Sequence, residues 1–327
     1  MRFVVRRLGF FIVTLWAAVT LNFLLPRLMP GNPALAMMAQ YKGHISGQAL
    51  KALEVAFGVD THQSWLSAYF HYFGDIFTGH FGVSIVFQMR SVSYEVLQAL
   101  PWTLGLVGVT TVMAFMVGTL VGLAAGWKRG SKLDSVLPPV FVVTSAFPYF
   151  WVGLVAVWVF GYKLGWLPES GGYSANDQVG LDWHFIGDML EHSVLPAFTL
   201  LVTTIGGWIL TMRNTVITVL AEDYVRMARA KGLKPWTVMW GYAGRNAVLP
   251  NLTGFAMSLG FVVSGAILVE YVFNYPGLGW MLLDAVNSED YALMQALFLL
   301  ITVAVLLAIL ASDVLTAVLD PRTRDLR

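Results

Sequence analysis

Long apolar runs, separated by polar connections, dominate this chain of 327 residues. Six of the runs reach the roughly 18 residues that a helix needs to cross a lipid bilayer. They cover about 8–26, 103–126, 136–162, 195–217, 251–273 and 292–318, with ends defined to within a few residues. Apolar runs of this length are typical of membrane helices. The pattern therefore predicts an all-α membrane protein with six transmembrane helices.

The first run follows Arg2, Arg6 and Arg7 and has the general form of a secretory signal peptide. The apolar part of a signal peptide has only about 7–15 residues, and this run is longer. Ala34–Ala36 (ALA) offers a cleavage site, but it lies beyond a polar break. We therefore expect an uncleaved signal-anchor helix.

Lys and Arg fall mainly on one side of the predicted spans. With the N-terminus in the cytoplasm, the inner segments hold every Lys and Arg except Arg27, Lys42, Lys51, Arg90 and Lys163. Most of these exceptions lie in one long loop, to which the positive-inside rule gives little weight. The distribution predicts that both termini are cytoplasmic.

The loop at 27–100 is mostly unlike a membrane segment. Leu28–Pro33 (LMPGNP) must leave helix at its Pro and Gly, and Gln48–Val59 is typical of an amphipathic helix ended by Gly58. Gln63–Phe77 is rich in aromatic residues. It fits either the membrane interface, where Trp and Tyr rings gather, or a cap packed on the outer end of the bundle.

Two spans carry special residues. Gly118, Gly122 and Gly126 are spaced by four residues and form a ridge on one helical face. Such a ridge lets helix backbones approach closely, either as static packing or as a mobile seam. Pro148 in the third span should break or kink the helix near the middle of the membrane, where it would serve a path, a hinge or packing alone.

Composition excludes several classes of protein. A net charge of +1 argues against nucleic acid as a partner, and a chain without cysteine has no disulfide or thiolate metal site. The histidines all fall on the outer side, without an i, i+4 pair and with few acidic neighbours, so we expect loop and interface residues and no metal site. These are His44, His62, His71, His80, His184 and His192.

Motifs for catalysis are missing from the sequence. Gly126–Lys132 (GWKRGSK) lacks the spacing of a phosphate-binding loop and follows a membrane helix instead of a strand. The ionisable residues within the spans are Arg213, Glu270 and Asp313, each near a membrane face. A proton-driven transporter or a channel normally carries such groups near the midplane. The pattern favours transport driven by energy from another component over these classes.

A basic stretch, Asp223–Trp236 (DYVRMARAKGLKPW), stands out in a chain of which only 12% is charged. Acids at its start and bases before Gly232 predict a short helix with a favourable dipole. One face of this helix would hold Tyr224, Met227, Ala228 and Lys231. The stretch fits either binding to anionic lipid or insertion into the groove of a soluble partner.

Leu233 and Trp236 supply apolar side chains just beyond that helix. Ala228 and Gly232 would keep one face thin. A thin face slightly favours a protein partner, because a lipid-binding face would be expected to carry bulky side chains.

The chain as a whole resembles the permease subunits of bacterial ATP-binding-cassette importers of the dipeptide/oligopeptide class. No single match is specific, but together they run in order along most of the chain. The matching pieces are RRLGF at Arg6, PGNP at Pro30, FGVD at Phe57, GHFGVS at Gly79, LPWTL at Leu100, GSKLD at Gly130, PYFWVGL at Pro148, GWLP at Gly165, MRNTVI at Met212, DYVRMARAKGL at Asp223, RNAVLP at Arg245, GAILVEYVFNYPGLG at Gly265 and DPRTR at Asp320.

The resemblance implies a type I importer fold in a bacterial cell membrane, with three parts. Residues 1–100 would form the first helix and the outer loop, 101–320 the five-helix permease core, and 321–327 a cytoplasmic tail. The segment at about 221–233 would be the coupling helix that enters a cleft of a cytoplasmic ATPase. Its contact residues would be Asp223, Tyr224, Arg226, Ala228, Lys231, Gly232 and Leu233.

Two departures from other importer permeases leave the exact contacts open. Arg226 stands where many of them have an acidic residue, and the distance from Gly232 to Leu249 is longer than in classical sugar importers. Both departures are usual for the peptide class. Glu270–Gly279 (EYVFNYPGLG) would re-enter the membrane or cap the outer mouth, and its Glu270 fits either a gate or path residue or a helix-end acid that pairs locally. Residues expected at a gate or path are Pro148, Glu270, Pro276, Gly277 and Gly279.

The resemblance also implies the partners: a second permease subunit, two ATPase subunits, an outer solute-binding protein and membrane lipid. It favours a distinct chain over a second copy as the second permease. ATP and Mg²⁺ would bind the ATPases, and we expect no cofactor on this chain and no enzymatic activity of its own. Peptides are the expected solute, while glutathione, oligosaccharides and nickel remain open because related importers carry them. A membrane scaffold without a transport role is the alternative of another class.

Overall fold

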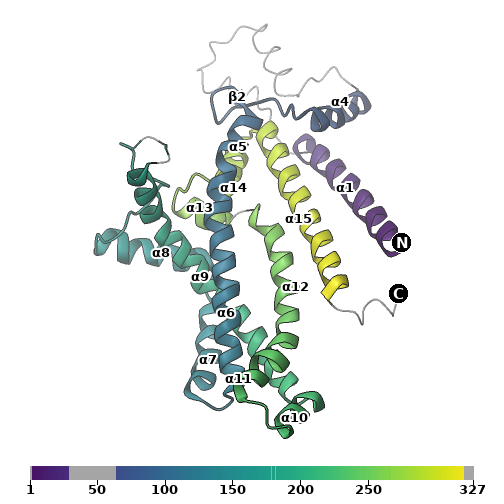
Figure 1. Ribbon diagram of the computed structural model, residues 1–327. Helices are drawn as coiled ribbons and strands as arrows, with labels where there is room; N and C mark the ends of the chain where they lie inside the picture. Colours follow the sequence, from purple (N-terminus) through teal and green to yellow (C-terminus); the bar gives the residue numbers. More distant parts are fainter. Residues whose placement is uncertain (1, 29–63, 178, 181, 265, 320–327) are drawn as a thin grey trace.

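A computed structural model describes residues 2–28, 64–177, 179–180, 182–264 and 266–319, and most of these residues are helical (Figure 1). The segments at 28–33 and 48–59, the ALA site, His44, His62 and the tail at 321–327 lie wholly or almost wholly outside the described residues. The elements are α1 (Arg2–Leu28), α4 (Trp65–Thr78), β1 (Val83–Ser84), β2 (Arg90–Ser91), α5 (Val92–Thr103), η1 (Leu104–Gly108), α6 (Val109–Trp127), α7 (Lys132–Ala146), α8 (Tyr149–Ala156), η2 (Val157–Lys163), α9 (Trp183–Leu220), α10 (Asp223–Ala230), α11 (Pro235–Thr237), η3 (Val238–Gly244), α12 (Arg245–Val262), α13 (Ile267–Val272), α14 (Leu278–Asn287) and α15 (Tyr291–Leu319).

Several helices are long and apolar enough to cross a membrane. Three qualify by themselves: Val92–Trp127, Trp183–Leu220 and Tyr291–Val314. The first runs through α5, the π-helical segment η1 and α6 without a break. The broken pair α7 and α8–η2 qualifies as a fourth, and Gly9–Leu25 of α1 is a shorter apolar helix. The chain is thus an all-α membrane protein with several apolar helices, while the count of six spans stays a prediction.

The predicted break at Pro148 is confirmed. The helix that begins at Lys132 ends at Ala146, and Pro148 is the N-cap of α8. The two halves, Lys132–Thr144 and Tyr149–Lys163, meet at an angle of 91°. A proline disrupts helical geometry because it lacks a backbone N–H and its ring clashes with the preceding turn.

The prediction of one continuous span at 251–273 was wrong. Helix α12 ends at Val262, and α13 starts at Ile267 as a separate short helix. At this end the Ser264 hydroxyl turns back and donates to the carbonyl oxygen of Phe261 (2.6 Å). The Ser264 backbone N–H donates to the same carbonyl (3.1 Å), and this bond to the third residue back tightens the last turn of α12, where the helix ends.

The predicted glycine ridge lies against α9. A Cβ atom at Gly118 would lie 2.6 Å from the Cβ of Trp208, and one at Gly126 would lie 2.8 Å from the carbonyl oxygen of Arg213. At Gly122 it would lie 2.5 Å from the carbonyl oxygen of Ile209. The backbones of α6 and α9 therefore touch along three turns, which only glycine allows.

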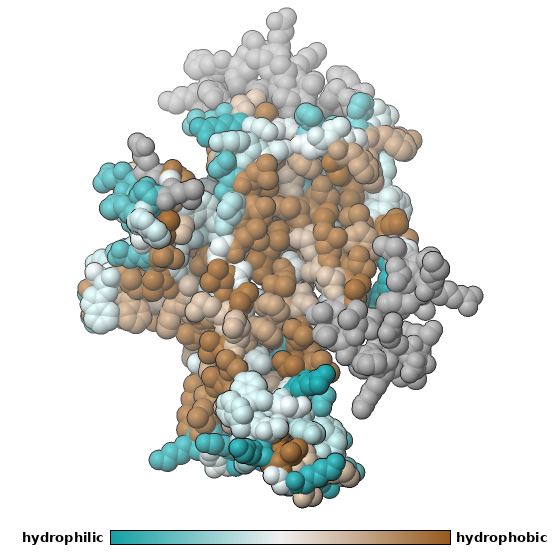
Figure 2. Space-filling view, viewed as in Figure 1, coloured by the Kyte–Doolittle hydropathy of each residue, from teal (hydrophilic) through white to brown (hydrophobic). Residues whose placement is uncertain are grey.

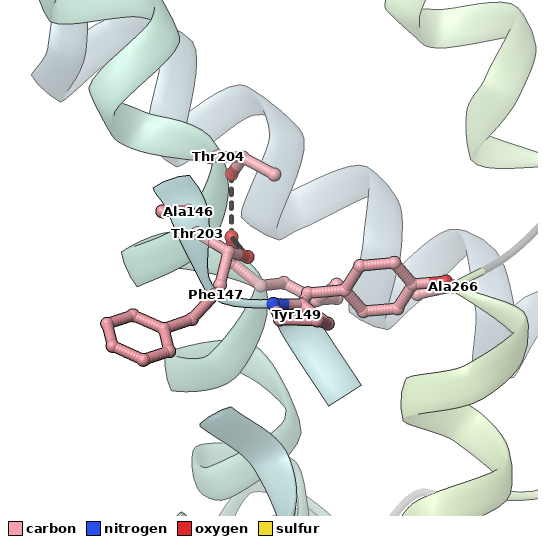
Figure 3. A pocket seen from close by; sticks show the side chains of 8 residues that line it. Ala146, Phe147, Tyr149, Thr203, Thr204 and Ala266 are labelled. Carbon is pink, nitrogen blue, oxygen red and sulfur yellow. Dashed lines mark hydrogen bonds between the residues drawn. The ribbon is translucent and has the colours of Figure 1, made fainter. Parts of the chain in front are cut away.

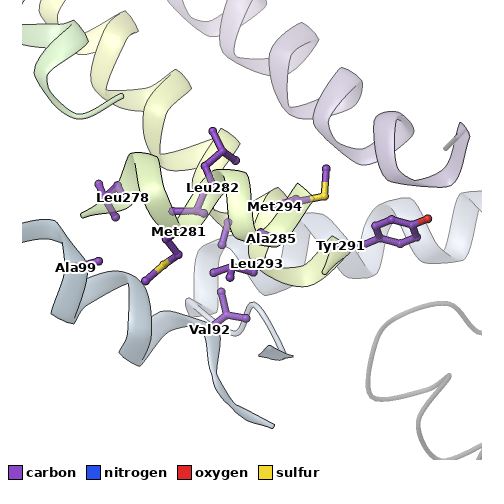
Figure 4. Close-up of a cluster of buried hydrophobic side chains, with 11 residues drawn as sticks. Val92, Ala99, Leu278, Met281, Leu282, Ala285, Tyr291, Leu293 and Met294 are labelled. Carbon is purple, nitrogen blue, oxygen red and sulfur yellow. The ribbon is translucent and has the colours of Figure 1, made fainter. Parts of the chain in front are cut away.

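The end of the molecule that carries α4, α5 and α14 holds a compact apolar core (Figure 4). The buried members of this cluster are Val92, Ala99, Leu278, Met281, Leu282, Ala285, Tyr291, Leu293, Met294, Ala296 and Leu297. The Asp290 carboxylate, which is fully buried, accepts bonds from the Ser84 hydroxyl (2.5 Å), the Ile85 N–H (2.7 Å) and the Leu293 N–H (3.1 Å). It thereby caps α15 and fastens the β1–β2 hairpin to it.

The aromatic segment at 63–77 forms α4, which packs on the bundle by one face. Phe23 of α1 contacts Tyr69 and Tyr72 of α4, and Asn22 donates to the Tyr72 hydroxyl (2.9 Å). Burial raises the pKa of Tyr72 to about 12, so this phenol stays neutral. The opposite face is exposed and includes Trp65, Leu66, Phe70 and Phe77. The packed face agrees with the expected cap, while the interfacial role of the exposed aromatic face stays a prediction.

Hydrophobic surface covers the middle of the molecule (Figure 2). Polar side chains gather at the end that carries α10 and at the opposite end, near α4. The exposed apolar residues of the middle part belong to α1, α6, α7 and α8, among others. A broad apolar band between two polar ends fits a bilayer as the solvent of this chain.

Candidate functional site: the α10 surface and a cavity at two helix breaks

Helix α10 is anchored to the rest of the chain by its own apolar residues. Val225 and Ala228 are buried and pack with Val238 and with parts of Trp127 and Leu233. The sequence prediction placed Ala228 on a face presented to a partner. That placement was wrong, because Ala228 is 3% exposed and faces inward. Its small size lets α10 lie close to η3 instead.

Gly232 ends α10 through its backbone conformation. Its φ of 73° lies in the left-handed region, and an added Cβ would meet nothing within 4 Å. The Gly232 N–H donates to the carbonyl of Arg229 (2.9 Å), and the Leu233 N–H donates to the carbonyl of Ala228 (3.4 Å). These two bonds define a Schellman cap, in which glycine is the usual residue. The backbone conformation gives this glycine a structural role, and its place on a thin docking face stays a prediction.

The exposed face of α10 carries a mixture of apolar and basic groups. Met227 is 59% exposed and Tyr224 is 40% exposed, with the exposed Arg226 on the same short helix and the exposed Lys231 at its C-cap. Asp223 is exposed as well and lies 3.6 Å from Arg226. A surface of this kind, with an apolar centre and charged rim, is typical of protein docking sites.

A hydrogen bond links α10 to α12. Asn246, in the first turn of α12, donates to the Tyr224 hydroxyl (2.9 Å). Five residues further along α12, Asn251 donates to the Thr119 hydroxyl of α6 (3.0 Å) and to the Trp208 carbonyl of α9 (3.2 Å). Helix α12 thus connects the α10 surface to the packed pair α6 and α9. Its Asn251 is 1% exposed.

A cavity of about 550 Å³ opens where two helices break (Figure 3). It lies beside the α7–α8 break and reaches Ala266, at the break between α12 and α13. The wall between them comes from α9. Its lining residues are Ala146, Phe147, Pro148, Tyr149, Leu200, Thr203, Thr204 and Ala266. Pro148, predicted at a path or hinge, is therefore part of a cavity wall.

The segment around Glu270 forms a turn that is held from within. Glu270 is fully buried and accepts bonds from the Thr103 hydroxyl (3.0 Å), the Gly279 N–H (2.7 Å) and the Trp280 N–H (3.3 Å). A Cβ at Gly277 would overlap the Glu270 carboxylate. This carboxylate thus satisfies the first N–H groups of α14, and the structure places it away from the cavity lining.

Pro276 and Gly172 bring two connections together near this turn. A Cβ at Gly172 would lie 2.7 Å from the ring of Pro276 and 3.1 Å from Trp102. The Gly171 N–H donates to the carbonyl of Phe273 (2.7 Å). The connection after η2 therefore folds back over the Glu270 segment at this end of the molecule.

The other two ionisable residues expected within spans form ion pairs. The Arg213 guanidinium lies 2.7 Å from the Asp134 carboxylate and connects α9 to the start of α7. Arg7 pairs with Asp313 and connects α1 to α15. Among the described residues, His, Asp and Glu side chains form no cluster of three or more that could hold a metal ion.

Comparisons with known proteins identify the family. Residues 118–325, more than half of the chain, match the family "binding-protein-dependent transport system inner membrane component". The chain belongs to this family. It is a multi-pass membrane protein of permease type.

Relatives match over nearly the whole chain. The di/tripeptide transport system permease protein DppB of Pseudomonas aeruginosa (strain UCBPP-PA14) is 34% identical over 99% of both chains. The oligopeptide transport system permease protein AppB of Bacillus subtilis (strain 168) is 32% identical over 98% of both. The glutathione transport system permease protein GsiC of Escherichia coli (strain K12) is 32% identical over 99% of both. The resemblance to permeases of the dipeptide/oligopeptide class is thereby confirmed.

Sequence reasoning missed the residues that the fold brings together at the cavity. Phe147 and Tyr149 flank the predicted break, so the break itself was the available signal. Thr203 and Thr204 form a hydroxyl pair inside an apolar span, which is a weaker signal. Ala266 lines the cavity because the fifth predicted span is broken beside it, between α12 and α13.

Proposed function

We propose that this chain is a transmembrane permease subunit of an ATP-driven importer and that its solutes are peptides. The peptide class rests on the relatives, whose names specify di/tripeptide, oligopeptide and glutathione transport. The cavity between two helix breaks carries the proposal for this chain itself. Breaks inside membrane helices are found where they line a path or lie against other protein.

The orientation follows the charges of the sequence. The end that carries α10 holds Arg226, Arg229, Lys231 and Lys234, and basic connections favour the cytoplasm. We therefore place α10 and both termini on the cytoplasmic side, with six spans in all. The Glu270 segment, Pro276, Gly277 and Gly279 then lie on the outer side, where an extracytoplasmic binding protein would deliver the solute.

Helix α10 would dock into a cytoplasmic ATPase, in which ATP and Mg²⁺ bind. The exposed face around Tyr224, Met227 and Lys231 would form the contact, and Val225 and Ala228 would fix that face to the permease. Closure of two ATPase subunits would then move α10 and, through the Asn246–Tyr224 bond, α12. ATP drives such a change only if it favours one state over the other.

A second permease subunit would close the open side of the cavity. Phe147 is 51% exposed and Tyr149 is 37% exposed in this single chain. Exposed aromatic groups at a helix break inside the membrane need either lipid or a neighbouring protein. A membrane scaffold without a transport role explains neither the break nor the cavity, so we favour transport.

Purification with the native partner subunits tests the docking surface. Met227→Glu places a carboxylate at the centre of the α10 face and removes none of the contacts that hold α10. We expect the ATPase to dissociate and solute-stimulated hydrolysis to fall by at least tenfold, as is typical when a charge is buried without a partner at an interface.

Lys128→Glu is the matched control. Lys128 is exposed in the connection between α6 and α7, so its replacement puts a carboxylate at the same end of the molecule but off α10. Normal copurification and hydrolysis are expected for it. Full stimulation in the Met227→Glu complex would refute the proposed docking surface and favour a lipid-binding role for α10.

A further inference from the structure

The cavity at the helix breaks is lined by hydrogen-bond acceptors and aromatic rings. The Thr203 hydroxyl donates to the carbonyl of Thr199 (2.8 Å), and the Thr204 hydroxyl donates to the carbonyl of Leu200 (2.6 Å). Both hydroxyl hydrogens are thus committed within α9. The two oxygen atoms remain free to accept bonds from the cavity side, since a hydroxyl oxygen has two lone pairs.

The described lining carries no charged side chain. Phe147 and Tyr149 contribute rings (Figure 3), and Leu200 and Ala266 add aliphatic surface to the lining. A carboxylate or ammonium group held deep in such a lining would lose its hydration without gaining an ionic partner. The lining suits a neutral group that donates hydrogen bonds and has apolar neighbours.

We infer that this cavity is a binding site for the backbone of the transported peptide, with Thr203 and Thr204 as acceptors for its amide N–H groups. The inference rests on the proposed function. A volume of about 550 Å³ lies within the range of ordinary ligand pockets, about 300–1,000 Å³. Peptide side chains would pack on Phe147, Tyr149 and Leu200. Recognition through amide groups accepts many different side chains, as a general peptide path requires.

Single cysteines test occupancy of the site directly, because the natural chain has no cysteine. Thr203→Cys and Thr204→Cys would each be introduced into the complete complex in lipid, with the partner permease, the ATPases and the binding protein. A small maleimide then labels the thiol with and without a saturating tripeptide such as trialanine, and intact-mass spectrometry reads the adduct on this chain. We expect the peptide to slow labelling at both positions by at least fivefold.

Thr215→Cys is the control position. Thr215 lies on the same helix and its hydroxyl also donates to the carbonyl four residues earlier (2.8 Å), but it does not line the cavity. Peptide should leave its labelling rate unchanged. Equal protection at Thr215 would mean a general conformational change and would overturn the assignment of the site.

The acceptor role has a second test, in which the peptide is changed as well. The double variant Thr203→Val, Thr204→Val removes both oxygens, and Thr203→Ser, Thr204→Ser keeps them. Peptide transport should fall roughly fivefold or more in the Val variant, as for the loss of a neutral hydrogen bond, and stay near normal in the Ser variant. A peptide whose amide nitrogens are methylated has no N–H groups to donate to these oxygens. The Val variant should therefore transport it at nearly the same rate as the natural protein.

The outcomes separate the site from the function. Transport of peptide without protection of Thr203→Cys and Thr204→Cys, or an equal loss for the methylated peptide, would overturn the site and leave the proposed function standing. A complex that imports no peptide at all would overturn the proposed function and this inference with it.

Discussion

The contact between α6 and α9 permits a quantitative prediction from one methyl group. Gly122→Ala adds a Cβ that would lie 2.5 Å from the carbonyl oxygen of Ile209 and 2.8 Å from the Cβ of Met212. Both neighbours are backbone or the first side-chain carbon, so neither can rotate away. The helices must separate by about 1 Å to restore ordinary van der Waals distances.

Separation weakens the whole contact between the two helices. Overpacking in a tight core typically costs about 1–3 kcal/mol, and the exchange of glycine for alanine inside a helix returns only about 0.5–1 kcal/mol. The difference between these two ranges is about 0–2.5 kcal/mol, and the contact with a rigid backbone oxygen places Gly122→Ala in its upper part, at a net loss of about 1–2 kcal/mol of unfolding free energy. The loss should be visible because Gly118 and Gly126 lie at the same contact and would be displaced with it.

The assay is reversible unfolding of the purified chain in mixed micelles, followed by tryptophan fluorescence. Gly207→Ala is the matched control, because Gly207 lies on α9 and a Cβ there meets nothing within 4 Å. This variant should be as stable as the natural protein or slightly more stable. A neutral Gly122→Ala variant would show that the backbones of α6 and α9 are farther apart than in this structure.

Two further predictions concern the ends of short helices. Glu270→Ala leaves the N–H groups of Gly279 and Trp280 without their acceptor. Hydrogen exchange of these two amides should therefore accelerate by roughly tenfold or more. Unchanged exchange would contradict the role of this carboxylate as a cap for α14. Gly232→Asn should preserve ATPase stimulation better than Gly232→Ala, because Asn adopts the left-handed conformation more readily. Better stimulation with Gly232→Ala would instead favour a thin docking face, where the smaller side chain is tolerated.

The sequence predicted those parts of the fold that local physics dictates. The apolar runs located the long helices, because a membrane helix must be apolar over its whole length. Pro148 located a break for a reason contained in one residue. The glycine ridge gave the face of α6 that lies against α9, although the partner helix itself could not be known from spacing.

What could not be predicted depends on contacts between distant segments. The break between α12 and α13 contains no proline that could have signalled it. The segment after the break is fixed by the buried Glu270 carboxylate of α13, which binds the first N–H groups of α14. Ala228 was assigned to the wrong side because a helix with small and basic residues does not reveal which face its own chain covers. The cavity joins residues from positions near 147, 203 and 266, which only the tertiary structure brings together.

Helix α9 connects the cavity to the α10 surface through a single uninterrupted stretch. Thr204 lines the cavity, and α9 ends at Leu220, three residues before α10 begins. The sixteen residues from one to the other span about 24 Å, so a tilt of about 10° around the α10 end would shift the cavity wall by about 4 Å. This arrangement has the mechanics of a lever arm, in which a small rotation at the docking surface becomes a displacement close to the width of a peptide chain.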